Sequence, residues 1–193
     1  MIALVLGLLL TPPSDAPAAV IRTSAGEIVV GLDVERAPGT TCNFLRYAAA
    51  GAYDGGAFFR TVVFETDANP SQIDVVQAAT PAGSDDPGFG PIPLERTRDT
   101  GLRHVSGAIS MARGEPDTAT SSFFIVVEDT GNLDFGGDRH PDGQGFAAFG
   151  RVLDGMDVVR AIHAMPATDE QLDQPVRIET VALLTDIPAR CRG

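Results

Sequence analysis

Short apolar segments alternate with stretches of Gly, Pro, Asp and Asn along most of the chain. Residues 19–34, AVIRTSAGEIVVGLDV, form two blocks of alternating apolar and polar positions around Ser24-Ala25-Gly26, which predicts two antiparallel strands joined by a tight turn. Six further apolar runs have the length of a strand and lie between turn-forming stretches. They occupy residues 58–64, 73–79, 107–112, 123–128, 146–153 and 176–185.

Two segments have helical spacing instead. Residues 38–50 begin with Pro38, a residue favoured at the first position of a helix, and continue with apolar residues on one side. Residues 156–164 repeat the pattern, with Asp154 as the candidate N-cap. Many strands with one early and one late helix predict a mainly β fold, in which an antiparallel sheet closes into a barrel and each end is covered by a helix.

The N-terminus has the features of an export signal. The apolar run of residues 1–10 is too short to span a bilayer and is followed by prolines and small residues with an A-x-A pattern. We expect a signal peptide over 1–18, a single domain over 19–193, and a periplasmic or secreted protein. The alternative is a buried N-terminal strand. In an exported protein Cys42 and Cys191 could pair, or they could be two unrelated thiols.

Composition and charge narrow the classes of function. The 193 residues include 21 Gly and 14 Pro, no Lys at all, and a net charge of -12. A phosphate-binding patch is excluded by this balance, so no nucleic-acid partner is expected. Once the signal is cleaved, the sequence offers no long amphipathic or basic helix for a membrane.

Motifs for hydrolysis and metal binding are weak. The three histidines have no metal-ligand spacing and are expected at the surface, and a Ser110–His104 hydrolase lacks the sequence context of a nucleophile. The acidic loop 129–143 could hold calcium, although its spacing differs from an EF-hand and Asp and Gly are also what tight turns require.

Three segments carry a specific resemblance. Phe58-Phe59-Arg60, Val75-Val76-Gln77 and the block 110–125, SMARGEPDTATSSFFI, occur in this order, followed by Leu133-Asp134 and 149–152, FGRV. Together they resemble the cyclophilin family of peptidyl-prolyl cis/trans isomerases over about residues 21–185. The resemblance implies a closed antiparallel eight-stranded β-barrel capped by two α-helices. It also implies a monomer that acts on proline-containing unfolded or exported polypeptides and needs no cofactor or metal.

The resemblance also assigns the site. Arg60 matches the catalytic arginine of the family, and Gln77 would orient it or the substrate carbonyl. A fixed cation suits this reaction because the prolyl nitrogen regains a lone pair as the amide twists out of plane. Backbone groups of Arg113 would contact the peptide, with Phe123 supporting the pocket from beneath. The expected substrate-binding residues are Phe59, Val75, Ala112, Arg113, Gly114, Ser122, Phe124, Leu133 and Phe146.

Some positions depart from the family pattern. Residues 66–71 look like an inserted turn, Asp74 stands where a pocket phenylalanine is common, and Phe146 replaces the usual histidine. These departures leave a second hypothesis open, a catalytically weak module that binds or chaperones proline-containing segments. Arg60 itself could have a carboxylate partner or face a cleft, because an unpaired buried arginine is costly.

Overall fold

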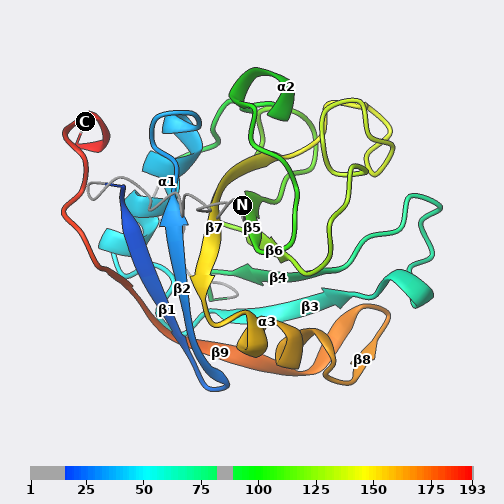
Figure 1. Cartoon of the computed structure of the whole chain (residues 1–193). Helices are drawn as coiled ribbons and strands as arrows, with labels where there is room; N and C mark the ends of the chain where they lie inside the picture. Colours follow the sequence, from blue (N-terminus) through cyan, green and yellow to red (C-terminus); the bar gives the residue numbers. More distant parts are fainter. Residues whose placement is uncertain (1–15, 82–88, 193) are drawn as a thin grey trace, which may run out of the picture.

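The computed structural model describes residues 16–81 and 89–192, and these fold into a closed antiparallel β-barrel with helices at its ends (Figure 1). Eight strands follow one another around the barrel, and the pairing of β1 with β9 closes it. A two-residue strand, β8, adds to the edge of β9. In sheet order the strands are β1 (Ala18–Thr23), β2 (Gly26–Leu32), β7 (Ala147–Asp154), β5 (Ala108–Met111), β6 (Phe123–Val126), β4 (Val75–Ala79), β3 (Ala57–Val62), β9 (Gln171–Leu183) and β8 (Ala167–Thr168).

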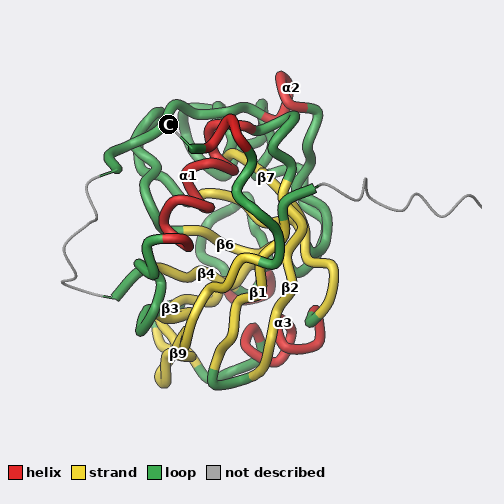
Figure 2. The backbone as a smooth tube through the Cα atoms, turned by 90° about the vertical axis from the view of Figure 1, so that its left-hand side faces the viewer, coloured by secondary structure: helices red, strands yellow, loops and turns green. Residues whose placement is uncertain are grey.

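Helices α1 (Pro38–Ala49) and α3 (Met156–His163) lie towards opposite ends of the barrel, in the upper and the lower half of both views (Figures 1 and 2). α1 contacts β7 and β9, whereas α3 contacts β2, β3 and β4. A single-turn helix, α2 (Thr97–Thr100), lies in the long connection between β4 and β5. The barrel and the two capping helices expected from the sequence are confirmed.

The two-residue period of the strands separates two apolar clusters. Phe123 and Ile125 of β6 point into the barrel and pack with α1 in the main core, whereas Phe124 and Val126 belong to a second cluster on the other face. Strand β4 divides in the same way, with Val76 inside and Val75 in the second cluster. One set of alternating residues therefore packs in the main core, and the other forms a separate, smaller apolar cluster.

Three local expectations were wrong. Asp154 does not cap α3, because Gly155 occupies the N-cap position with φ +89° and the Asp154 carboxylate accepts a hydrogen bond from the Gly155 N–H. The last strand begins at Gln171 rather than 176, since Gln171 and Leu172 pair with β8 and Gln171 also pairs with β3. His104 is buried rather than exposed.

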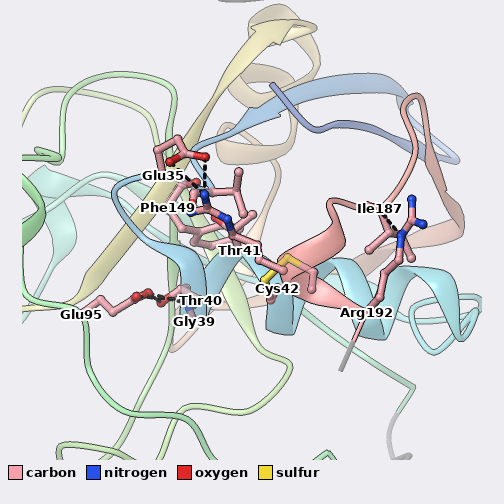
Figure 3. The surroundings of a disulfide bond; sticks show 12 residues. Glu35, Gly39, Thr40, Thr41, Cys42, Glu95, Phe149, Ile187 and Arg192 are labelled. Atoms are coloured by element: carbon pink, nitrogen blue, oxygen red, sulfur yellow. Dashed lines mark hydrogen bonds and ion pairs between the residues drawn. A yellow bond between two sulfur atoms is a disulfide. The ribbon is translucent and has the colours of Figure 1, made fainter. Parts of the chain in front are cut away.

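The two cysteines form a disulfide, which the sequence left open. Cys42 lies in α1 and Cys191 in the 3-10 turn η2 (Ala189–Cys191), with 4.9 Å between their Cα atoms (Figure 3). The N-terminus of α1 has no local side-chain cap. Glu95 substitutes for one, because its carboxylate accepts hydrogen bonds from the Gly39 N–H (2.9 Å) and the Thr40 N–H (2.8 Å).

The expected signal peptide lies almost entirely outside the described residues. Strand β1 begins at Ala18, one residue before the expected domain start. In the ranges 16–81 and 89–192, none of the helices is long and apolar enough to cross a bilayer.

Candidate active site

Strand β3 carries a β-bulge immediately before Arg60. In the β3–β4 ladder Phe58 and Arg60 pair with the adjacent residues Ala78 and Gln77, so Phe59 is the extra residue. The β3–β9 ladder is also irregular at this step, but there the extra residues lie on β9, between Gln171 and Val176. A bulge bends its strand and changes the direction of the side chains that follow. Arg60 consequently lies opposite Gln77 of β4 and opposite Gln171 of β9, with 28% of its side chain exposed.

A chain of hydrogen bonds runs from Arg60 across the sheet. Arg60 Nη1 donates to Gln77 Oε1 at 2.9 Å, and Gln77 Nε2 donates to Ser122 Oγ at 3.0 Å. The Ser122 hydroxyl donates in turn to the Ala78 carbonyl at 3.0 Å. The expected role of Gln77 in orienting Arg60 thus has a geometric basis, and Ser122 fixes the Gln77 amide.

The other edge of the Arg60 guanidinium is held by Glu170, in the turn between β8 and β9. Arg60 Nε donates to Glu170 Oε2 at 2.9 Å, and Nη2 contacts the same oxygen. The sequence left open whether Arg60 has a carboxylate partner or faces a cleft; the structure supplies the partner and keeps the side chain partly exposed. Within the described ranges, three of the five guanidinium N–H groups have acceptors, so one N–H on Nη1 and one on Nη2 remain for a ligand.

Next to this arginine lies the second apolar cluster. Gln77 lies opposite Arg60 and also pairs with Phe124 in the β4–β6 ladder, so one strand, β4, separates Arg60 from Phe124. Val75, Phe124 and Leu133 are buried in the cluster, and Ala112 and Phe146 pack against it. Thus five of the expected substrate-binding residues are brought together. The cluster also contains Val62, Ile73, Ala108 and Val126, which strand alternation could have identified.

Phe146 is fixed from two sides. Its ring meets Phe124 edge to face, with 5.6 Å between ring centroids, and the Arg113 guanidinium lies 5.0 Å from its centroid. Arg113 uses all five of its N–H groups, towards the Asp142 carboxylate and the carbonyls of Gly114 and Gly145. Its side chain is 1% exposed. The Arg113 hydrogen bonds lower the pKa of Asp142 to about 2.

Two expected residues lie apart from the cluster. Phe59 is half-buried at the bulge and Gly114 is exposed, and neither belongs to the apolar cluster. A Cβ added at Gly114 would meet the Thr118 hydroxyl at 3.7 Å, an ordinary contact, so the position has room for a side chain.

Asp74 points away from the apolar cluster. Its carboxylate accepts a hydrogen bond from the Phe64 N–H at 2.9 Å and lies 3.2 Å from His163 Nε2 of α3. The neighbouring Ile73 enters the cluster and is 4% exposed. The inserted turn is anchored rather than loose, since Asp67 pairs with Arg139 of the acidic loop.

A buried polar chain supports Phe124 from behind. The His104 ring is stacked on Phe124, His104 Nδ1 lies 2.8 Å from Asp134 Oδ1, and Nε2 lies 2.9 Å from Ser110 Oγ. Burial lowers the pKa of His104, although the nearby Asp134 carboxylate acts to raise it. The pKa of Asp134 is also lowered: burial acts to raise it, but the hydrogen bonds with His104 and Arg103 outweigh burial. The neutral imidazole therefore donates from Nδ1 to the carboxylate and accepts from Ser110.

The order Ser110–His104–Asp134 resembles a hydrolase triad, but its serine is not accessible to a substrate. Ser110 is 0% and His104 1% exposed, so a substrate cannot reach the hydroxyl. Three carboxylates of the acidic loop likewise have protein partners: Asp134 binds His104, Asp142 binds Arg113, and Asp129 accepts from the Ser106 N–H at 2.7 Å. Among the described residues, no group of three or more His, Cys, Asp or Glu side chains is arranged to hold a metal ion.

Comparison with known proteins identifies the family. Residues 18–183 match the family model described as cyclophilin type peptidyl-prolyl cis-trans isomerase. The chain belongs to the cyclophilin-type isomerases. Among cyclophilin relatives, it is 36% identical over 165 residues to peptidyl-prolyl cis-trans isomerase cyp18 of Streptomyces antibioticus, covering 84% of this chain and 93% of that protein. It is 32% identical to peptidyl-prolyl cis-trans isomerase B of Escherichia coli, covering 84% and 93%.

A solved cyclophilin agrees in fold. The cyclophilin type peptidyl-prolyl cis-trans isomerase of Cryptosporidium parvum superposes with a TM-score of 0.71 at 19% identity, over 89% of this chain and 99% of that one. Sequence reasoning missed Glu170, the residue that forms an ion pair with Arg60. Glu170 lies 110 residues from Arg60 along the chain.

Proposed function

We propose that this cyclophilin accelerates the cis/trans isomerisation of Xaa-Pro bonds in unfolded or exported polypeptides, with Arg60 stabilising the twisted prolyl amide. One observation carries the proposal: Arg60 is held between Gln77 and Glu170, keeps two N–H groups for a ligand, and stands one strand from an apolar cluster suited to a proline ring. The reaction makes and breaks no covalent bond, so the proposal includes no cofactor or metal.

The chemistry follows from amide resonance. Rotation about the prolyl bond has a barrier of about 20 kcal/mol, most of it due to loss of resonance in the planar amide. As the bond twists, the nitrogen becomes pyramidal and regains its lone pair. A fixed N–H donor at that nitrogen is bound more strongly in the twisted state than in either planar state, and that difference is catalysis.

Arg60 accounts for part of the rate. A pre-organised donor is worth about 3–4 kcal/mol, whereas an acceleration of about 10⁵-fold needs about 7 kcal/mol. The remainder is assigned to holding the proline ring against Phe124, Leu133 and Phe146 while the flanking peptide is fixed. In this proposal the backbone of Arg113 binds the peptide, because the side chain is fully engaged elsewhere.

The proposed location is the periplasm or the exterior. Its supports are the apolar N-terminal run and the Cys42–Cys191 disulfide, since such bonds persist mainly in oxidising compartments. The net charge of -12 disfavours nucleic acid as a partner, and we propose that the barrel works as a monomer on polypeptide clients.

The test is cis-to-trans isomerisation of a short Xaa-Pro peptide by the purified protein, beside Arg60→Ala and Arg60→Lys. The matched control is Arg22→Ala, which removes an arginine that also pairs with a glutamate but lies on β1. We expect activity to collapse in Arg60→Ala, to fall strongly in Arg60→Lys because the forked donor is lost, and to persist in the control. A folded wild type that binds the peptide without accelerating rotation would instead identify a binding module.

A further inference from the structure

The turn between β8 and β9 has an unfavourable backbone. Thr168 pairs with Gln171, so the hairpin turns through Asp169 and Glu170 alone. Both residues have positive φ, +49° and +64°. Two-residue turns of this kind accept Asn, Asp or Gly at the first position and favour Gly at the second, where a longer side chain crowds the left-handed region, so the less favourable residue is Glu170. Neither residue of this turn is glycine, so the hairpin carries strain that a glycine would relieve.

The strain coincides with a contact to Arg60. The Glu170 carbonyl accepts a hydrogen bond from the Thr61 N–H at 2.9 Å, which fixes the turn against the strand that carries Arg60. From that position the Glu170 carboxylate reaches Arg60 Nε. Backbone outliers that persist beside a functional group are a reason to ask what they hold in place. Here they hold a carboxylate on the guanidinium.

The contact leaves Arg60 usable. Glu170 takes the Nε side and one N–H of Nη2, and Gln77 takes one N–H of Nη1. An arginine side chain has many rotamers, and two partners on different groups restrict it to one orientation before a peptide binds. With 31% of its side chain exposed, Glu170 lies at the surface beside the site rather than in the core.

We infer that Glu170 is a positioning residue for Arg60, an inference that rests on the proposed function. Glu170 does not touch the prolyl bond; it fixes the direction of the two remaining N–H groups. Its contribution therefore falls on the conversion of bound peptide rather than on peptide affinity. The alternative is that the Glu170 carboxylate offsets the positive charge that Arg60 presents to the peptide. In that case removing the carboxylate would speed the reaction.

The turn provides matched variants. Glu170→Gly removes the carboxylate and the strain at its own position, whereas Asp169→Gly places a glycine at the adjacent turn position and leaves the carboxylate. Glu170→Gln keeps an oxygen acceptor without charge. We expect kcat/KM to fall about tenfold in Glu170→Gly and about threefold in Glu170→Gln, and to stay unchanged in Asp169→Gly. Neither glycine variant should melt below the wild type.

Two readouts separate positioning from mere structural support. The rate of exchange of a bound Xaa-Pro peptide, measured by NMR, should fall in Glu170→Gly while peptide Kd stays within twofold. Unchanged or faster isomerisation in Glu170→Gly overturns the inference. If even the wild type does not accelerate rotation, the proposed function fails, and hydrogen exchange at the Arg60 Nε–H then tests the positioning role by itself. Protection that is lost in Glu170→Gly but kept in Asp169→Gly supports positioning. Equal protection in the two variants overturns it.

Discussion

The His104 imidazole lies nearly parallel to the Phe124 ring, with 6.1 Å between their centroids and 18° between their planes. The imidazole is in turn fixed by Asp134 and Ser110. A wall of the expected proline site is therefore supported by a buried polar group whose charge state matters for folding.

Acid should destabilise the fold through His104. Burial lowers its pKa below 6.5 in the folded state, so the stabilising contribution is complete above about pH 6.5 and is lost as pH falls towards the lowered value. Asp134 has a lowered pKa too, so its contribution disappears only below about pH 3.8. Urea midpoints measured from pH 8 to pH 5 should fall in the wild type. An unchanged midpoint across that range contradicts a neutral buried imidazole.

Replacing Gln77 with leucine should impair catalysis more than stability. The change removes the acceptor of Arg60 Nη1, a charged hydrogen bond, and we expect kcat/KM to fall about tenfold. Ser122→Ala is the graded comparison, because it only frees the far end of the Gln77 amide and should cost about threefold. Peptide isomerisation assays on both variants test this. A larger loss of kcat/KM in Ser122→Ala than in Gln77→Leu would contradict the order of the hydrogen bonds from Arg60 through Gln77 to Ser122.

Arg113→Ala should destabilise the protein by about 3 kcal/mol, because it removes the ion pair with Asp142, leaves the Gly145 carbonyl without its Arg113 donors and uncovers Phe146. Arg22→Ala breaks an exposed pair with Glu27 and should cost less than about 1 kcal/mol. Chemical denaturation of both variants tests this difference. Equal effects mean that Arg113 contributes no more than a surface arginine.

Loss of the disulfide should lower the free energy of unfolding by up to about 5 kcal/mol, since the bridge joins residues 149 positions apart and restrains a large loop in the unfolded chain. The Cys42→Ser, Cys191→Ser double variant should still isomerise peptides, because the bond lies at α1, away from Arg60. The measurements are the urea midpoint and the peptide assay; an intact midpoint in the double variant refutes the stabilising role.

Local sequence patterns predicted the strands and helices. They did not predict contacts between residues that are distant in the sequence. The resemblance assigned Phe124 to the pocket and Phe123 to a supporting position beneath it, and in the structure the two residues belong to different clusters. Glu170 could not be found in this way, because its turn lacks glycine and its partner lies 110 residues away. The burial of His104 likewise depends on Asp134, which a loop brings from 30 residues further along.

The closure of the barrel sets the order of events in folding. β1 completes its pairing only with β9. The N-terminus of α1 is capped by Glu95, which accepts a hydrogen bond from the Thr40 N–H and lies 55 positions after Thr40 in the sequence. Contacts this distant in sequence are slow to form. One edge of the first strand must therefore remain unpaired until β9 is free to fold, so the barrel cannot close while β9 is still being synthesised.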